Sequence, residues 1–277
     1  MNWKIVADSS SNLMELDGME YTSVPLKIIT DQKEYVDCPG LDVKGMVEDL
    51  QRYKGKSGSS CPNAQEWIDS FGEAEAVFGV TISSNLSGSY AAAIQAAEDH
   101  RTAHPGAKVF IMDSLSAGPE MQLFIEKAKE LIHNGLSFEK VCEQIKEYAR
   151  RTHLLFALQS LKNLANNGRV SPAAAAISGA LGIRVVGKAS DQGTLQPLHK
   201  CRGENATLRT IVKEMLQNGW KGGKVRISHC LNRESASALA DLLRKEHKNC
   251  SIEILPCTAL CSFYAEKGGL IIGYEGA

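Results

Sequence analysis

The sequence lacks an excess of charge of either sign. Its 277 residues include 31 lysines and arginines against 32 aspartates and glutamates. A protein that binds nucleic acid or an anionic surface through its overall field needs a basic excess. The balance therefore argues against nucleic acid as a partner. The one basic stretch, Lys200 to Arg226, is interpreted as a solvated helix face, with a docking surface for an acidic partner as the alternative.

Long apolar runs are also missing. No stretch approaches the roughly 18 consecutive apolar residues that mark a membrane-spanning helix, so we expect no integral membrane segment. The short apolar run at the start passes directly into Asp8 and the serines after it, a pattern unlike that of a secretory signal. We therefore expect a cytoplasmic protein.

The eight cysteines show neither a disulfide framework nor a metal site. Six are scattered, and Cys257 and Cys261 are separated by three residues instead of the two usual in zinc sites, with no histidine pair after them. Free thiols in a reducing compartment are the simplest interpretation. No metal is expected.

Motifs of three common α/β protein classes are absent or incomplete. There is no Gly-x-Gly-x-x-Gly of a dinucleotide site and no Gly-x-Ser-x-Gly elbow of an α/β-hydrolase. Gly55-Lys56-Ser57 resembles the end of a phosphate-binding loop, but Leu50 stands where its first glycine belongs. His153, His199 and His229 lie at or beside predicted strands and are interpreted as packed or edge residues. We identify no catalytic residue and expect no cofactor.

What the sequence does contain is an alternation of apolar strands and helices. Up to about residue 150, short strands at 4–7, 77–82 and 109–112 are followed by segments with apolar residues at helical spacing. Such alternation requires crossover connections and predicts a mainly parallel α/β/α sheet. The segment 53–76, whose first part is small and polar, is predicted to be an excursion toward a second domain.

From about residue 151 the pattern changes. A hairpin with Gly193 in its turn is predicted between two strands, and further short apolar strands alternate with helices. We expect a second α/β domain with a mixed or antiparallel sheet. The predicted fold class is therefore α/β with two domains, at residues 1–150 and 151–277.

The three strands of the first domain each end in hydroxyl-bearing residues, at Ser9–Ser11, Ser83–Ser89 and Ser114–Ser116. Because the carboxyl ends of parallel strands lie at one edge of a sheet, where ligands bind, we expect these hydroxyls to converge. The run Ser83–Ser89 also starts a helix, whose free N–H groups favour a carboxylate or phosphate. Gly88 permits close approach of a ligand to the backbone. The alternative is that these serines only cap the helix.

Five sequence elements together resemble one known family. The Ser-Ser-x-Leu-Ser-Gly element and the Gly-Arg element are the specific ones, and the others support them. The five elements are Ala7–Ser10, Ile82–Tyr90, Met112–Ser114 with Gly118, Leu161–Leu164 followed by Gly168–Ser171, and Gly268–Tyr274. On these residues the chain resembles, from end to end, the DegV family of bacterial two-domain proteins that bind a fatty acid.

The resemblance implies a non-catalytic protein with an acyl chain in a tunnel between its domains. Several members of the family act as the lipid-presenting subunit of a fatty acid kinase, whose separate partner binds ATP. Ser83, Ser84 and Gly88 match the family's head-group loop, and Ser59-Ser60 match a second loop that ends in proline. The alternative for the second loop is a mobile polar segment without a role in binding.

Two further positions are implied by the resemblance. Arg169 matches the family's arginine, and a guanidinium can pair with a carboxylate; a surface ion pair is the alternative. Many members carry a histidine near the end of the chain, where this sequence has Tyr264. A tyrosine donates a hydrogen bond but brings no positive charge, so we expect fatty acid binding to tolerate the change more easily than the kinase-linked role.

The acyl tail requires an apolar tunnel. The segment Ala173–Ala176, together with Ile177 and Gly179–Leu181, offers small apolar side chains that leave room for methylenes. Each buried methylene contributes roughly 0.8 kcal/mol, so a long chain binds tightly with few polar contacts. Close packing of a helix against a sheet is the alternative for this segment.

Two other functions stay open at the level of sequence. A serine-dependent acyl hydrolase needs a serine within reach of a histidine, and no motif supplies that pair. A protein-interaction module would act through the basic stretch at 200–226, with any lipid serving only as structure.

Overall fold

The protein is described by a computed structural model at residues 1–176 and 182–277. The predicted tunnel residues Ile177 and Gly179–Leu181 lie outside the described residues. Within them, no helix has the length and apolar character required to cross a membrane.

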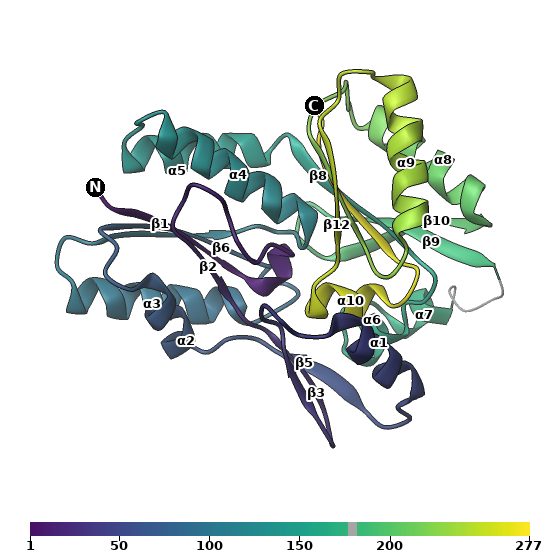
Figure 1. Cartoon of the computed structure of the whole chain (residues 1–277), viewed down its shortest axis with the longest axis horizontal. Helices are drawn as coiled ribbons and strands as arrows, with labels where there is room; N and C mark the ends of the chain where they lie inside the picture. Colours follow the sequence, from purple (N-terminus) through teal and green to yellow (C-terminus); the bar gives the residue numbers. More distant parts are fainter. Residues whose placement is uncertain (177–181) are drawn as a thin grey trace.

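The first half of the chain forms a four-stranded parallel sheet in the order β2-β1-β6-β7. Neighbouring residues of β1 enter different cores, with Ile5 facing α4 and α5, and Val6 facing α2 and α3. This follows from the two-residue period of a strand and produces three layers (Figure 1). The predicted parallel α/β/α sheet is confirmed. The bounds are β1 (Trp3–Asp8), β2 (Tyr21–Val24), β6 (Ala76–Thr81), β7 (Lys108–Asp113), α2 (Ala64–Phe71), α3 (Ser89–Ala103), α4 (Pro119–His133) and α5 (Phe138–Ala149).

The second half forms a six-stranded sheet in the order β10-β9-β8-β13-β11-β12. Strands β11 and β12 run parallel, and the other neighbouring pairs run antiparallel. The sheet is therefore mixed, as the sequence predicts. Helices α8 and α9 cover one face, and α6, α7 and α10 lie on the other side. The bounds are β8 (Thr152–Leu158), β9 (Ile183–Ala189), β10 (Leu195–Arg202), β11 (Val225–His229), β12 (Ile252–Pro256), β13 (Leu270–Glu275), α6 (Lys162–Asn166), α7 (Pro172–Ala176), α8 (Glu204–Gln217), α9 (Arg233–Glu246) and α10 (Ala259–Ala265).

Helix α4 lies between the two large sheets. It packs against β1 and β6 of the first and against β8, β11 and β13 of the second. Every residue from Pro119 to Ile125 is buried, so the first half of the helix has no solvent face and belongs to the core. Gly273 of β13 allows this contact, because a Cβ atom there would lie 2.4 Å from the main-chain nitrogen of Glu120.

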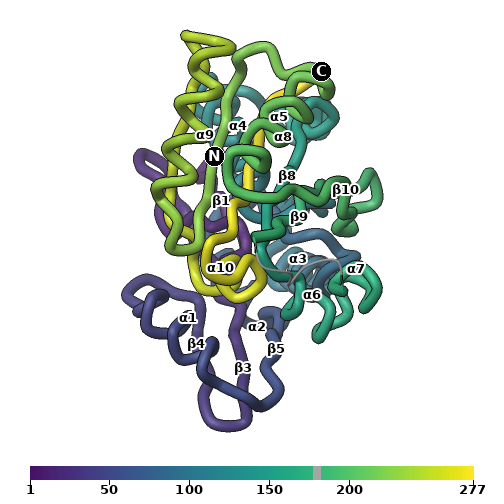
Figure 2. Tube along the Cα trace, turned by 90° about the vertical axis from the view of Figure 1, so that its right-hand side faces the viewer, coloured from purple at the N-terminus to yellow at the C-terminus, as the bar shows by residue number. Residues whose placement is uncertain are grey.

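A third, smaller sheet projects away from the two large ones (Figure 2). It is antiparallel, in the order β4-β3-β5. Strand β5 falls within the segment predicted as an excursion, and Asn167 Nδ2 of the second half donates to the carbonyl of Ser57 at 3.3 Å. The predicted domain boundary near residue 150 stays a prediction, although it falls between the strands of the two large sheets. The bounds are β3 (Lys27–Thr30), β4 (Glu34–Val36), β5 (Ser57–Ser60) and α1 (Val43–Arg52).

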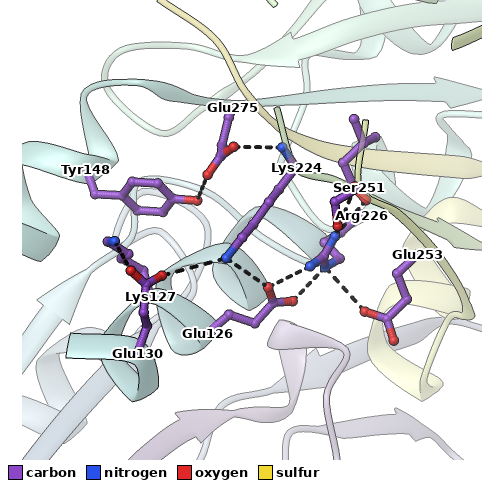
Figure 3. Close-up of polar contacts among 10 residues, drawn as sticks. Glu126, Lys127, Glu130, Tyr148, Lys224, Arg226, Ser251, Glu253 and Glu275 are labelled. Atoms are coloured by element: carbon purple, nitrogen blue, oxygen red, sulfur yellow. Dashed lines mark hydrogen bonds and ion pairs between the residues drawn. The ribbon is translucent and has the colours of Figure 1, made fainter. Parts of the chain in front are cut away.

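Polar contacts fasten the two large sheets along α4 and α5 (Figure 3). The Arg226 guanidinium of β11 forms a bidentate pair with Glu126 of α4, with N···O distances of 2.6 Å and 2.7 Å. Tyr148 of α5 donates to Glu275 of β13 at 2.7 Å. Two parallel charge-assisted hydrogen bonds fix orientation as well as distance. These contacts therefore hold α4 and α5 on the six-stranded sheet.

Candidate functional site

A cavity of about 290 Å³ lies between the two large sheets, beside α10. Most of its wall is apolar, and Arg169 is the one charged side chain among the described residues that line it. No histidine is found among those lining residues, so the hydrolase alternative lacks a general base at this site. The apolar lining consists of Leu26, Ile82, Leu86, Ala117, Leu154, Phe156, Leu158, Leu164, Leu195, Leu260, Ala265 and Ile271.

The polar lining residues gather where β5, α10 and the loop after β6 meet. Ser59 Oγ lies 2.7 Å from the hydroxyl oxygen of Tyr264. Cys61 Sγ lies 3.3 Å from the position that a Cβ of Gly88 would take. We call this group the polar mouth of the cavity, and it consists of Ser59, Ser60, Cys61, Ser87, Gly88, Arg169 and Tyr264.

Arg169 is positioned by the end of helix α6. Gly168 adopts a left-handed conformation with φ 74°, and the Arg169 N–H donates to the carbonyl of Leu164 at 2.8 Å, which is a common way to terminate a helix. The guanidinium then donates through Nε to the carbonyl of Leu86 at 3.0 Å and through Nη1 to the carbonyl of Asn167. A guanidinium has five N–H donors, so donors remain for an anion in the mouth.

Asp8 holds three parts of the site together. Its buried carboxylate accepts hydrogen bonds from the Ile82 N–H at 2.9 Å, from the Ser89 hydroxyl at 2.6 Å and from the Ser10 hydroxyl. These partners lie in the loop after β6, at the start of α3 and after β1. Burial raises the pKa of Asp8, and the hydrogen bonds oppose that effect. Asp8 therefore fixes the loop after β6 to the end of β1 and to the start of α3.

Helix α10 carries Tyr264 and is fixed by residues from the first half of the chain. The carboxylate of Asp37 accepts hydrogen bonds from the N–H groups of Ala259 at 2.8 Å and Leu260 at 3.0 Å. Asn12 accepts a hydrogen bond from the Thr258 N–H at 2.5 Å. Two otherwise unpaired N–H groups of the first helical turn are satisfied in this way. The position of Tyr264 thus depends on contacts more than 200 residues apart in the sequence.

The structure brings five of the seven sequence-predicted site residues together at the cavity. Ser59, Ser60, Gly88, Arg169 and Tyr264 line it. The other two, Ser83 and Ser84, lie in the first half of the head-group loop and are not among the lining residues. Ser83 is buried beside Gly193, and Ser84 is exposed.

Several lining residues were not singled out from the sequence. Ser10 and Ser87 belong to the hydroxyl clusters after β1 and β6, so these two clusters reach the cavity as expected. After β7 only Ala117 lines it, and the hydroxyls of Ser114 and Ser116 are not among its lining residues. The apolar run of β8 indicates a core strand, but it does not indicate that Leu154, Phe156 and Leu158 line a cavity. Leu195 carries no local signal at all. The described segment Ala173–Ala176 is not among the lining residues.

The cysteines are free thiols. Burial raises the pKa of Cys261, which lines the cavity, so this thiol is neutral and unreactive at neutral pH. Within the described part of the chain, no group of three or more potential metal ligands occurs.

Together, the fold and the site define a class of protein. It is an α/β protein with a largely apolar cavity between two sheets and a mouth that carries hydroxyls and one guanidinium. The family model described as "Uncharacterised protein, DegV family" matches residues 2–276. The chain therefore belongs to the DegV family, which confirms the resemblance.

Individual relatives agree over their whole length. A DegV domain-containing protein of Streptococcus pneumoniae is 39% identical and is matched over 99% of both chains. The structure of a DegV family protein from Eubacterium eligens, loaded with heptadecanoic acid, is 38% identical with a TM-score of 0.98, over 99% of this chain and 100% of that one. The Streptococcus pneumoniae Fatty Acid Kinase (Fak) B3 protein, loaded with linoleic acid, is 39% identical with a TM-score of 0.98, over 100% of both chains.

Proposed function

We propose that this protein binds a long-chain fatty acid, with the tail in the cavity and the carboxylate in the polar mouth. The observation that carries the proposal is a largely apolar cavity with one cationic side chain, Arg169, among its described lining residues. Burial of a long acyl chain contributes roughly 0.8 kcal/mol per methylene. The fatty acids in the two relatives support the same ligand class.

Each mouth residue has a distinct role in this proposal. Arg169 supplies the positive charge and charge-assisted hydrogen bonds. In the bond between Ser59 and Tyr264, one hydroxyl donates and the other accepts, so the accepting hydroxyl can donate its own proton to the carboxylate. Ser60 adds a hydroxyl, and Gly88 lets the backbone approach. Ser83 and Ser84 act through the conformation of their loop.

We further propose that the protein is a non-catalytic, cytoplasmic carrier for a separate ATP-binding fatty acid kinase. The Fak B3 name of the pneumococcal relative supports this role. Cys61 and Gly88 at the polar mouth are exposed, so a bound head group would be accessible to such a partner. The protein itself needs no cofactor for this function.

Arg169→Ala tests the ligand assignment. We expect its affinity for oleate to fall about tenfold to a hundredfold, because a charge-assisted pair contributes roughly 1.5–3 kcal/mol. Isothermal titration of lipid-free protein measures the effect. Arg244→Ala is the control, since Arg244 lies on α9 in an exposed pair with Asp241 and should not alter affinity.

Native mass spectrometry of the protein purified from a bacterial host provides an independent test. A long-chain acid should be released from the wild-type protein. A wild-type protein that carries no lipid and ignores added oleate would refute the proposed function.

A further inference from the structure

The turn between β9 and β10 lies against the other half of the chain. We refer to residues 190–195 as the hairpin tip. Ser190 N–H donates to the Thr194 carbonyl at 2.8 Å, Gly193 N–H donates to the Ser190 carbonyl at 2.8 Å, and the hydroxyls of Ser190 and Thr194 are 2.8 Å apart. These polar groups bond to one another within the tip, so they are not used to hold it to the rest of the chain.

The tip touches the loops that follow β6 and β7. The side-chain amide of Asn85 donates to the main-chain carbonyl of Gln192 at 2.7 Å. Gly193 lies so close to Ser83 and Leu115 that an added Cβ would come within 2.2 Å of Ser83 Oγ and 2.8 Å of Leu115 Cα. The φ of Gly193, 72°, also favours glycine.

Empty space lies on both sides of the tip. On one side, Leu195 lines the cavity. On the other side, Ser190 and Asp191 line a groove of about 670 Å³ that also includes Leu115. Leu154 lines both spaces, so it forms a partition together with the tip. The groove leaves room for the tip to move away from the cavity.

The remaining contacts between the sheets are stronger than those of the tip. Arg226 and Glu126 form a bidentate ion pair (Figure 3), and the buried amide of Asn12 donates to Ser228 Oγ at 3.0 Å. Asn85, by contrast, is exposed and makes one neutral hydrogen bond to the tip. Neutral bonds are about half as strong as charge-assisted ones, and the exposed bond of Asn85 competes with water whereas the buried bond of Asn12 does not. The tip is therefore the first of these contacts to open.

The hairpin also contains a point at which it can bend. The pairing of β9 with β10 shifts register between Pro197 and His199. Proline has no N–H for the ladder, and an irregularity of this kind bends a strand locally. Strand β9 stays paired with β8 up to Lys188, so only the residues beyond Lys188 on β9 and before the shift on β10 can swing while the rest of the sheet stays paired.

From this arrangement we propose that the hairpin tip is a side gate for the acyl chain and that Asn85 is the positioning residue that holds it closed. Opening breaks the bond between Asn85 and Gln192 and withdraws Leu195 from the wall. The cavity then joins the groove, and the tail enters or leaves without separation of the two sheets. The gate rests on the proposed fatty acid site.

Stopped-flow exchange of bound oleate for a fluorescent fatty acid tests the gate. In Asn85→Ala, the association and dissociation rate constants both rise about fivefold, because one neutral hydrogen bond is lost from the closed state. The equilibrium affinity changes little. Gln192→Ala is the matched control, since it keeps the carbonyl that Asn85 binds and should exchange lipid at the wild-type rate.

A second ligand separates positioning from contact with the head group. Oleyl alcohol has the same tail and no carboxylate, so a gate accelerates its exchange as much as that of oleate. Acceleration restricted to oleate would mean that Asn85 acts on the carboxylate, and the proposal would be wrong. Unchanged rates for both ligands would also overturn it.

Hydrogen exchange tests the tip without any ligand. Asn85→Ala and Gly193→Ala should each increase amide exchange at residues 190–195. Gly135→Ala should not, because Gly135 has a similar φ of 76° with nothing within 4 Å of its added Cβ. Unchanged exchange at the tip would refute the gate alone, whereas a wild-type protein that binds no oleate would refute the proposed function.

Discussion

The polar mouth combines one guanidinium with uncharged hydroxyls. Ser59, Ser60 and Arg169 could be found from the sequence because they match motifs of the family, and Tyr264 because it stands at the position of the family's histidine. The direction of Ser83 could not be found in this way. Its hydroxyl lies beside Gly193 instead of the cavity, and that contact depends on a hairpin more than 100 residues away in the sequence.

Glu120 is a second residue whose behaviour only the structure reveals. It is 5% exposed and accepts hydrogen bonds from Ser116 at 2.5 Å and Thr152 at 2.7 Å. Burial raises its pKa from 4.5 to about 7. The unfolded chain therefore releases this proton at lower pH than the folded protein does. Glu120 thus lowers the free energy of unfolding progressively as the pH rises from about 4.5 to about 7.

We expect Glu120→Gln to remove this loss of stability. At pH 8 the variant should be more stable than the wild type by up to about 3 kcal/mol, and the two should differ least near pH 4.5. Urea unfolding between pH 4.5 and 8 measures the difference. Glu98→Gln, on the exposed face of α3, is the control and should keep the wild-type pH dependence. An identical dependence in Glu120→Gln would contradict the assignment.

At the scale of elements, local patterns predict what forms but not what each element contacts. The strands that became β1, β6 and β7, and the hairpin of β9 and β10, follow from apolar runs and a glycine turn. Strands β2, β3, β4 and β5 were not predicted, because each is only three or four residues long. The small polar residues of β5 were interpreted as a loop. The central place of α4 also has no local signal, since one face of its pattern could pack on either sheet.

Helix α10 shows how one element depends on a distant cap. It has seven residues, too few to be stable alone, and Asp37 supplies acceptors for two of its first N–H groups. Asp37→Ala should lower the free energy of unfolding by about 3 kcal/mol, since two buried donors lose their partner. It should also weaken oleate binding, because α10 positions Tyr264.

Asp42→Ala is the matched control for α10. Asp42 caps α1 by accepting a hydrogen bond from the Gly45 N–H at 2.9 Å, within the same segment of chain. Loss of this cap should cost about 1 kcal/mol and leave oleate affinity unchanged. Urea unfolding and titration with oleate measure both effects. Equal losses of affinity in the two variants would show that Asp37 has no special link to the site.

At the scale of the whole molecule, the two large sheets behave as one body only if the contacts along α4 hold. Arg226 is 7% exposed and is the residue through which α4, β11 and β12 meet, because it pairs with Glu126 and, at 3.2 Å, with Glu253 (Figure 3). The interpretation of this arginine as part of a solvated basic helix face is wrong, because it is buried and lies on a strand. The error is physical: burial of a charge depends on a partner from another element, and Glu126 lies 100 residues away.

Removal of this pair should uncouple the unfolding of the two sheets. Trp67 is buried in the layer of the first sheet and Trp220 in that of the second, so tryptophan-to-phenylalanine variants let fluorescence report each sheet separately. With Arg226 present, the fluorescence of Trp67 and that of Trp220 should give the same midpoint of unfolding in urea. In Arg226→Ala, which leaves Glu126 without its main partner at a cost of about 2–4 kcal/mol, the midpoints should separate. Arg244→Ala should keep them together, and coincident midpoints in Arg226→Ala would show that apolar packing of α4 alone couples the sheets.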